Sequence, residues 1–181
     1  MHLFSISQRA REQGLPSLLI GGHAVIAHGH PRNTFDLDLL ISRPSTEDWR
    51  SFLLAEGYRI RQEGSTFIQF DPPNEQTLPL DLMIVSAETY RKFEAEDLPL
   101  SAAEAGGVRV VALKHLLALK SHAIRHGNPG RVEKDVDDVI GLVQANRLNV
   151  AEAPWHEVFL KHGPPELHEK LLRIQRGAST G

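Results

Sequence analysis

Hydrophobic and polar positions form short blocks along the chain, and each block predicts one helix or one strand. Brief apolar runs between glycine, proline or polar breaks are typical of buried strands, whereas apolar residues spaced by three and four indicate amphipathic helices. We therefore expect strands at residues 17–20, 35–41, 58–62, 66–70, 78–85 and 108–111. We expect helices at residues 3–13, 23–28, 45–56, 87–96, 112–126 and 131–146, with one or two more after residue 150.

The order of these elements predicts the fold class. Strands occupy the first part of the chain and helices the last, which indicates an α/β (α+β) protein. We expect a sheet region at residues 1–111 and a helical region at residues 112–181. A length of 181 residues suits one domain, or a core domain with a small helical appendage.

The composition narrows the chemistry that is open to the chain. There is no cysteine, so catalysis must use carboxylates, histidine, lysine and hydroxyl groups. The formal net charge of -3 argues against a protein that coats nucleic acid, because such proteins usually carry a strong basic excess. No apolar run reaches the roughly 18 residues of a membrane-spanning helix, and residues 1–10 do not resemble a signal peptide. We therefore expect a cytoplasmic protein.

Two aspartates lie on the strand predicted at residues 35–41. Because side chains alternate faces along a strand, we expect Asp36 and Asp38 on one face, about 6–7 Å apart. We expect the apolar residues to face a core on the other side: Phe35, Leu37, Leu39 and Ile41. Like charges on one face are usually tolerated only when a cation or basic group neutralises them. A solvated edge strand that carries two acids is the alternative interpretation.

A third acid, Asp81, lies between two leucines in the apolar strand predicted at residues 78–85. A charge in that setting is costly unless it is paired or bound to metal. Together with Asp36 and Asp38 it would supply the oxygen ligands that Mg²⁺ prefers, in an arrangement that fits two-metal phosphoryl chemistry. The alternative is a structural ion pair between Asp81 and an arginine.

A glycine turn precedes the acid strand. Gly21 and Gly22 follow the first predicted strand, where glycines let the backbone approach a ligand and the amides of a helix start attract phosphate. Two glycines, thirteen residues and then Asp36-Leu-Asp38 resemble the signature of the nucleotidyltransferase superfamily, with its DNA polymerase beta-like fold. Further residues resemble the abortive-infection toxins of toxin–antitoxin systems: residues 21–24, Gly29, residues 32–34, Lys120 and residues 134–138.

This resemblance covers roughly residues 15–145 and implies a small mixed sheet flanked by helices. It also implies a Mg²⁺-dependent enzyme that moves a nucleoside monophosphate from an NTP to an acceptor hydroxyl. On this basis we expect Asp36 and Asp38 to hold two Mg²⁺ ions. We expect Asp81 at the ion nearer the acceptor hydroxyl, where it would ease deprotonation.

Lys120 lies near the centre of the apolar stripe of its predicted helix, so we expect it to face inward. Its ammonium either reaches back to the surface or points to the nucleotide phosphates, and we favour the second interpretation. Asp135 borders the apolar stripe of the next helix and is expected to orient Lys120 or the acceptor. Lys134 and Asp138 can be explained as a surface pair four residues apart. The stripe that Asp135 borders is predicted to consist of Val132, Val136, Val139 and Val143.

Two polar residues just before the acid strand have an open role. Arg32 and Thr34 would either bind phosphate, together with the Gly21–Gly22 turn and Lys120, or anchor their loop. His28 and His30 flank Gly29, and we assign them no metal.

The sequence leaves the acceptor open: a tRNA, a small molecule such as an aminoglycoside-like drug, or a protein hydroxyl. Net acidity disfavours a large RNA, although a local basic patch could meet a tRNA end. Candidates for such a patch are Arg9, Arg11, Arg125 and Arg131. A toxin role would add an antitoxin partner. The competing hypothesis is a catalytically inactive nucleotidyltransferase-like protein that binds a nucleotide or a partner, although a third carboxylate on a buried strand favours catalysis.

Overall fold

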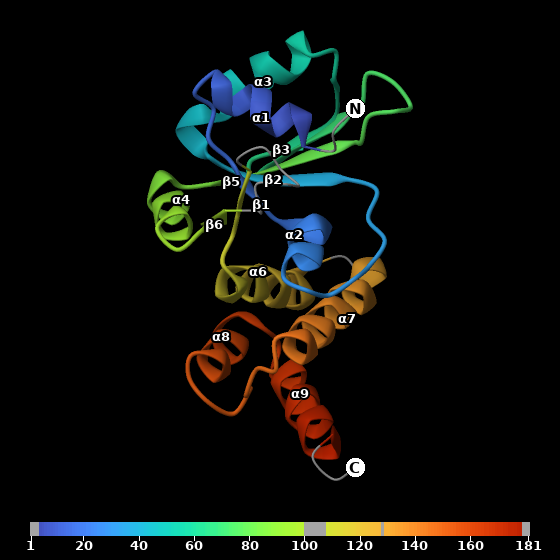
Figure 1. The fold of residues 1–181 in the computed structure, drawn as a ribbon, viewed down its shortest axis with the longest axis vertical. Helices are drawn as coiled ribbons and strands as arrows, with labels where there is room; N and C mark the ends of the chain where they lie inside the picture. Colours follow the sequence, from blue (N-terminus) through green and yellow to red (C-terminus); the bar gives the residue numbers. More distant parts are fainter. Residues whose placement is uncertain (1–3, 100–107, 128, 179–181) are drawn as a thin grey trace. The chain divides into compact units, whose positions relative to one another are not determined.

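The computed structural model describes residues 4–99, 108–127 and 129–178, and the chain divides into two compact units. The sheet unit comprises the chain up to Ala27 together with Arg32–Ala112, and the helical unit comprises His28–Pro31 and the chain from Leu113 onward. Figure 1 shows the elements of each unit. That the two are separate domains with a boundary at residues 111 and 112 stays a prediction.

The described strands of the sheet unit form one mixed sheet in the order β3-β4-β5-β2-β1-β7-β6. The pairs β2/β5 and β1/β7 are parallel, and the other neighbours are antiparallel. The strands are β1 (Leu18–Leu19), β2 (Leu37–Ser42), β3 (Arg59–Gly64), β4 (Phe67–Asp71), β5 (Leu80–Val85), β6 (Leu98–Pro99) and β7 (Arg109–Val110). This architecture confirms the predicted fold class, and only the two-residue strand β6 was not predicted.

Within the described part of the sheet unit, four α-helices lie around these strands: α1 (Ser5–Glu12), α2 (Gly21–Ala27), α3 (Thr46–Ala55), which follows the short 3-10 helix Arg43–Ser45, and α4 (Ala87–Glu94). Helices α1 and α3 lie on one face of the sheet (Figure 1). The α3 side chain Trp49 is fully buried there, donates its indole N–H to the carbonyl of Pro16 at 3.3 Å and meets Phe52 edge to face. Burying such an aromatic side chain is a large part of the hydrophobic stabilisation of a small core.

Strand β2 runs through the buried part of the sheet, but it begins two residues later than predicted. Leu37, Leu39, Leu40 and Ile41 are all buried, so the strand is covered on both faces. Phe35 precedes the strand, and its side chain is 76% exposed. The prediction that Phe35 faces the core was therefore wrong, because the alternation of faces holds only within a strand. Asp36 also lies just before the strand.

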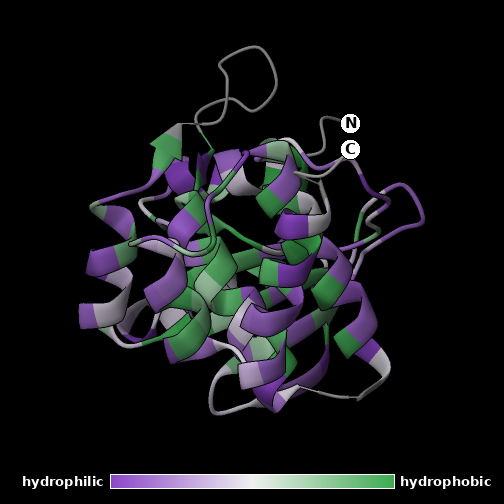
Figure 2. Cartoon of the chain, turned by 90° about the horizontal axis from the view of Figure 1, so that it is seen from below, coloured by the Kyte–Doolittle hydropathy of each residue, from purple (hydrophilic) through white to green (hydrophobic). Residues whose placement is uncertain are grey.

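The helical unit contains the remaining described helices: α6 (Leu113–His126), α7 (Pro129–Ala145), α8 (Trp155–His162) and α9 (Pro165–Ala178). Helix α6 packs against α7 and α8, and α8 packs against α9. Arg125 donates hydrogen bonds to three carbonyls at the end of α8, those of Leu160, Lys161 and Gly163. It thereby satisfies acceptors that have no partner within the helix. Figure 2 shows helices that carry both hydrophobic and hydrophilic residues, as expected for helices with one buried face.

The segment His28–Pro31 belongs to the helical unit although it lies between two elements of the sheet unit. Asn146, just after α7, donates from Nδ2 to the carbonyl of His28 at 2.9 Å. The ring of His30 lies against Gly141 so closely that a Cβ on that glycine would be 2.3 Å from the imidazole. These contacts explain the grouping, which the sequence pattern did not indicate. Within the described residues, no helix combines the length and the apolar character needed to cross a membrane.

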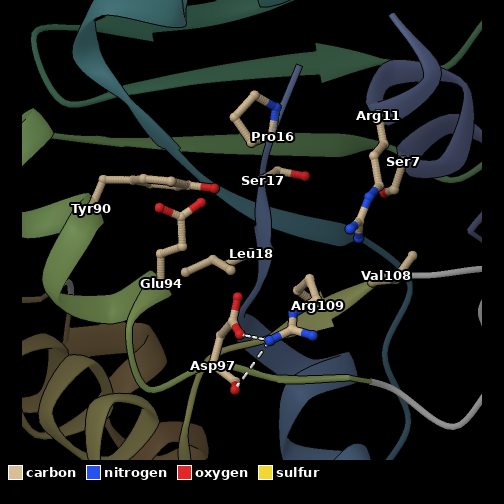
Figure 3. A pocket seen from close by; sticks show the side chains of 10 residues that line it. All are labelled: Ser7, Arg11, Pro16, Ser17, Leu18, Tyr90, Glu94, Asp97, Val108 and Arg109. Carbon is tan, nitrogen blue, oxygen red and sulfur yellow. Dashed lines mark hydrogen bonds and ion pairs between the residues drawn. The ribbon is translucent and has the colours of Figure 1, made fainter. Parts of the chain in front are cut away.

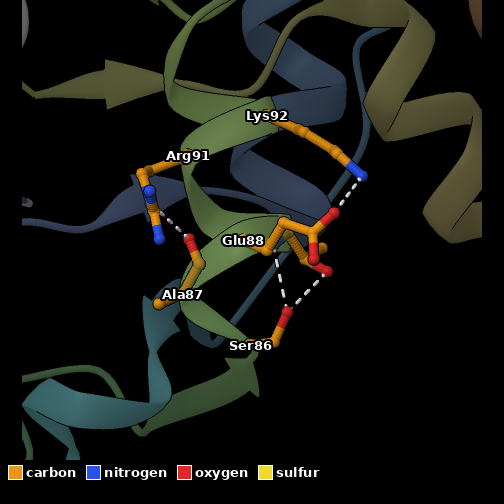
Figure 4. Close-up of polar contacts among 6 residues, drawn as sticks. Ser86, Ala87, Glu88, Arg91 and Lys92 are labelled. Atoms are coloured by element: carbon orange, nitrogen blue, oxygen red, sulfur yellow. Dashed lines mark hydrogen bonds and ion pairs between the residues drawn. The ribbon is translucent and has the colours of Figure 1, made fainter.

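Helix α4 begins with a side-chain cap, which Ser86 provides. The Ser86 hydroxyl accepts a hydrogen bond from the backbone N–H of Thr89 at 3.1 Å. Glu88 lies in the first turn and pairs with Lys92 at 2.8 Å (Figure 4). The hydroxyl cap satisfies an exposed amide of the helix start, and an acid in the first turn interacts favourably with the helix dipole.

We expect Ser86→Ala to lower the free energy of unfolding by about 1 kcal/mol, because the Thr89 amide loses its acceptor. Ser86→Asp is the matched control, since its carboxylate can accept the same hydrogen bond. Urea denaturation of the three proteins measures the difference. Equal losses in both variants would show that the cap does not stabilise this helix.

Candidate functional site

Polar side chains form a row across three adjacent strands of the sheet. Asp38 on β2 is directly opposite Asp81 on β5, and Asp81 is directly opposite Gln69 on β4. Residues opposite each other on neighbouring strands project from the same face, and the strands lie about 4.8 Å apart. Two of the three predicted metal-binding aspartates are therefore neighbours on one face of the sheet.

The glycine turn contacts Asp38. Gly21 has φ +62, a conformation that side chains rarely adopt. A Cβ on Gly21 would fall 1.8 Å from Oδ2 of Asp38, so the backbone approaches this carboxylate more closely than any other residue type allows. The backbone N–H of Ile20 also donates to the Asp38 carbonyl at 3.0 Å. Asp38 is thus fixed both along its strand and against the turn.

Asp36 is held by a neighbour in its own loop. Thr34 donates from its hydroxyl to Oδ1 of Asp36 at 2.9 Å. A Cβ on Gly22 would lie 2.4 Å from the Thr34 hydroxyl and 3.2 Å from the guanidinium carbon of Arg32. Arg32 donates from Nε to the carbonyl of Asn33 at 3.2 Å. The loop thus holds an acid, a hydroxyl and a guanidinium beside the glycine turn. This arrangement is compatible with both roles predicted for Arg32 and Thr34, phosphate binding and anchoring of the loop.

Asp81 has two side-chain partners from the neighbouring hairpin. Gln69 donates from Nε2 to Oδ2 of Asp81 at 2.6 Å. Arg61 on β3 places Nη2 3.5 Å from Oδ1 of Asp81. Asp81 therefore does contact an arginine, as the alternative prediction stated. The contact with Arg61 is long, however, and the hydrogen bond from Gln69 is shorter.

The donor set of this site fits Mg²⁺. Among the described residues, no three acidic or histidine side chains stand close enough together to form a metal site of protein ligands alone. Mg²⁺ rarely needs such a cage, because it is usually held by one or two carboxylates together with substrate phosphates and water. The neighbouring pair Asp38 and Asp81, with Asp36 two residues away, supplies that number of hard oxygen ligands.

In the helical unit, Lys120 is bound by two carboxylates of α7. Its Nζ lies 2.7 Å from Asp135 and 2.7 Å from Asp138. The Lys120 side chain is only 13% exposed, so the alternative in which its ammonium reaches back to the surface was wrong. The pairing with Asp135 agrees with the predicted orientation of Lys120. The functional roles predicted for Lys120 and Asp135 stay predictions.

Asp138 corrects the sequence interpretation of α7. Its side chain is 4% exposed and pairs with Lys120, so it is no surface partner of Lys134. The buried face of the helix contains Asp138, Val139, Leu142 and Val143, whereas Val132 and Val136 are only half-buried. The buried face is therefore rotated around the helix relative to the predicted valine stripe. The prediction did not allow for a buried acid that a lysine neutralises.

His23, in the first turn of α2, is a half-buried imidazole beside the loop acid. Burial lowers the pKa of His23 below its ordinary value, the Asp36 carboxylate raises it by a smaller amount, and the Arg32 guanidinium lowers it. Within the part of the chain that the structure describes, Nε2 of His23 is buried and has no hydrogen-bond partner. The ring meets Phe4 edge to face. These surroundings hold His23 neutral at pH 7.

A cavity of about 300 Å³ lies beside the start of β1 and is also lined by Arg109 of β7. Strand β1 runs from this cavity, which contacts Ser17 and Leu18, to the glycine turn at its far end. Figure 3 shows the side chains of α4 and the ion pair of Asp97 with Arg109 at the cavity wall. Burial, together with nearby Glu94 and Asp97, raises the pKa of the Tyr90 phenol in this wall. The cavity contains none of the predicted catalytic, metal-binding or nucleotide-binding residues, although Arg11, a candidate for the basic patch, lines it.

Arg9 and Arg125, two of the four arginines predicted as a basic patch, make structural contacts within the protein. Arg9 pairs with Glu56 at 2.6 Å and joins α1 to the end of α3. Arg125 caps α8, as described above. These contacts account for both side chains without a nucleic-acid partner.

Comparisons with known proteins identify solved structures with a similar fold. No family model and no curated protein matches the sequence. Among solved structures, ANT(2'')-Ia in complex with adenylyl-2''-tobramycin is similar with a TM-score of 0.58 and 17% identity over 94% of each chain. The lincosamide antibiotic adenylyltransferase LnuA, with lincomycin bound, has a TM-score of 0.51 and 16% identity over 77% of this chain and 93% of its own. A Megavirus polyadenylate synthase has a TM-score of 0.56 and 14% identity over 81% of this chain and 31% of its own.

These likenesses show that the chain has the nucleotidyltransferase fold, as the glycine and aspartate signature predicted. The narrower resemblance to abortive-infection toxins stays a prediction.

The sequence did not identify Gln69, Arg61 or His23 as site residues. Gln69 could have been found, because it is a polar residue between buried Ile68 and Phe70 on a strand of alternating pattern. Arg61 could not, because its position depends on an irregular strand pairing. His23 lies within residues 21–24 of the family resemblance, but the sequence predicted no role for it.

We expect Gly21→Ala to lower the free energy of unfolding by about 2–4 kcal/mol, since the new methyl group meets Asp38 as well as the strain of positive φ. Gly14→Ala is the matched control: Gly14 also has positive φ, but nothing lies within 4 Å of an added Cβ. Its expected loss is about 1 kcal/mol. Chemical denaturation compares the two variants, and equal losses would argue against the close contact with Asp38.

We expect the pKa of the His23 ring to lie below 6.5 in a histidine NMR titration, assigned with the variant His23→Gln. Because the native ring stays neutral, the unfolded chain takes up a proton first as the pH falls below 6.5, and stability decreases towards the native pKa. His23→Gln should therefore lose less stability than the native chain between about pH 7 and about pH 5. A ring pKa at or above 6.5 would contradict this account.

Proposed function

We propose that this chain is a Mg²⁺-dependent nucleotidyltransferase that transfers a nucleoside monophosphate from an NTP to a hydroxyl group of a small-molecule acceptor. The observation that carries the proposal is the pair Asp38 and Asp81 on adjacent strands, with the Gly21 backbone against Asp38, in a nucleotidyltransferase fold. A small acceptor is favoured because two similar structures of comparable length contain an adenylylated aminoglycoside and a lincosamide. The toxin role and an antitoxin partner stay predictions.

In this proposal the residues of the sheet unit divide the work. Asp36, Asp38 and Asp81 would hold Mg²⁺, which supplies charge neutralisation at the phosphates and at the acceptor oxygen. The backbone of the Gly21–Gly22 turn would contact the triphosphate, with Arg32 and Thr34 beside it. The acceptor oxygen forms a bond to the α-phosphorus, the bond to the β-phosphate oxygen breaks, and pyrophosphate leaves. Asp81 accepts the proton of the acceptor hydroxyl. Positioning and electrostatic stabilisation account for most of the rate in such reactions.

The test uses NTPs labelled at the α-phosphate, incubated with Mg²⁺ and a panel of aminoglycosides, lincosamides and tRNA. Label should appear on a small hydroxylated compound, together with pyrophosphate. Label on tRNA alone would contradict the small acceptor but not the transfer reaction. Absence of transfer with all four nucleotides would favour the catalytically inactive, nucleotide-binding alternative.

We expect Asp38→Asn to reduce this transfer by about 100-fold or more, the scale of losing one preorganised electrostatic group. Asp48→Asn is the matched control, since Asp48 is an exposed acid on α3. Thermal unfolding confirms that both variants are folded. Full turnover by Asp38→Asn would rule out the assigned site.

A further inference from the structure

A β-bulge places Arg61 at the candidate site. On β3, Ile60 is opposite Phe70 and Gln62 is opposite Gln69, so two steps along β3 match one step along β4. Arg61 is the extra residue between these pairs. A bulge bends its strand and changes the direction of the side chain, and bulges are common next to active sites. The irregular pairing therefore has a local result: the Arg61 side chain reaches past β4 to Asp81 on β5.

Arg61 lies between two carboxylates and is tightly bound to neither. Its Nη2 is 3.5 Å from Oδ1 of Asp81, and its Nη1 is 3.8 Å from Oδ1 of Asp71. The Arg61 side chain is 45% exposed, whereas that of Asp81 is 17% exposed. Ion pairs of this exposure and length contribute little to stability and rearrange at low cost. The guanidinium can thus move from one carboxylate to the other.

Gln69 holds the same carboxylate in a different way. It is directly opposite Asp81 and donates to the other carboxylate oxygen at 2.6 Å. An amide has no charge, so a cation that binds Asp81 does not repel it. Asp81 therefore has one short neutral contact on Oδ2 and one long charged contact on Oδ1.

We propose that Arg61 is a displaceable counter-ion of Asp81, which moves to Asp71 when a divalent cation binds, and that Gln69 keeps Asp81 oriented throughout. This inference rests on the proposed function, because it assigns Asp81 to the metal site. Before the cation arrives, the guanidinium offsets the repulsion between Asp81 and Asp38. Afterwards the cation takes over that task and repels Arg61, and Asp71 receives it. Arg61 and Gln69 are positioning residues in this scheme.

The scheme predicts opposite effects of two charge-removing variants on the binding of Mn²⁺ alone, measured by the electron paramagnetic resonance signal of free Mn²⁺ at low ionic strength. Arg61→Gln removes the competing cation and should lower the Kd by about tenfold, the scale of one unit charge several ångströms from the ion with water screening between them. Asp71→Asn removes the second carboxylate, leaves Arg61 on Asp81 and should raise the Kd. In Arg61→Gln/Asp71→Asn the Asp71 substitution should have almost no further effect.

Arg59→Gln is the matched control, because it removes the same charge from an exposed position on the same strand before the bulge. If Arg59→Gln and Arg61→Gln change the Kd equally, the effect is only one of net charge and the proposal is wrong. It is equally wrong if Asp71→Asn tightens Mn²⁺ binding.

The role of Gln69 is tested separately with Gln69→Leu. Its Kd for Mn²⁺ should stay within about twofold of the native value, since the charge of Asp81 is retained. The kcat of nucleotidyl transfer should fall at unchanged KM for the NTP, and Gln69→Asn should not restore it, because its shorter side chain cannot reach Oδ2. Unchanged kcat in Gln69→Leu would overturn the positioning role. Since Mn²⁺ binding needs no turnover, the expected Mn²⁺ pattern without any nucleotidyl transfer would contradict the proposed function alone.

Discussion

Asp38 and Asp81 stand side by side because β2 and β5 pair in parallel with these two residues in register. At about 5 Å and an effective dielectric constant near 20, two unit negative charges repel by about 3 kcal/mol. The surrounding structure offsets this repulsion. Gly21 presents its backbone to Asp38, Gln69 donates to Asp81, and Arg61 adds a positive charge beside it. In the loop before β2, the Thr34 hydroxyl likewise donates a hydrogen bond to Asp36. Each carboxylate of the candidate site thus has a partner that orients it and leaves the negative charge in place.

The same electrostatic problem is solved differently in the helical unit. Lys120 contacts Asp135 and Asp138 at equal distances, and all three side chains are largely buried. Burying charges costs desolvation energy that mutual attraction only partly repays, so such groups are weak evidence for stability but fix the positions of their neighbours. Here the triad joins α6 to α7. The segment His28–Pro31, held by Asn146 and Gly141, ties the chain to the same helix.

The two ends of β1 lie in different surroundings: one leads into the glycine turn, and the other borders the cavity. At its end the strand enters the glycine turn, where backbone and carboxylates meet without space for a Cβ. At its start it borders a cavity whose charged groups already include the ion pair of Asp97 with Arg109. The glycine turn instead contacts Asp38, which lies opposite Asp81 on the adjacent strand. For this reason the proposed chemistry is placed at the acid row and not at the cavity.

The sequence by itself determined which segments form strands and helices, and it placed Asp38 and Asp81 on strands and the glycines at the turn, because hydrophobic spacing and glycine are local signals. It also indicated an inward-facing Lys120, which follows from helical periodicity alone. The tertiary structure decided which residues from distant parts of the chain meet, and a local sequence pattern does not contain that information. The strand register brought Asp81 against Asp38 and Gln69, and a bulge directed Arg61 to Asp81. A buried counter-charge took Asp138 into the core, and the later start of β2 left Phe35 exposed. Each of these outcomes depends on contacts between residues far apart in the chain, whose pairing is set by the packing of the whole unit.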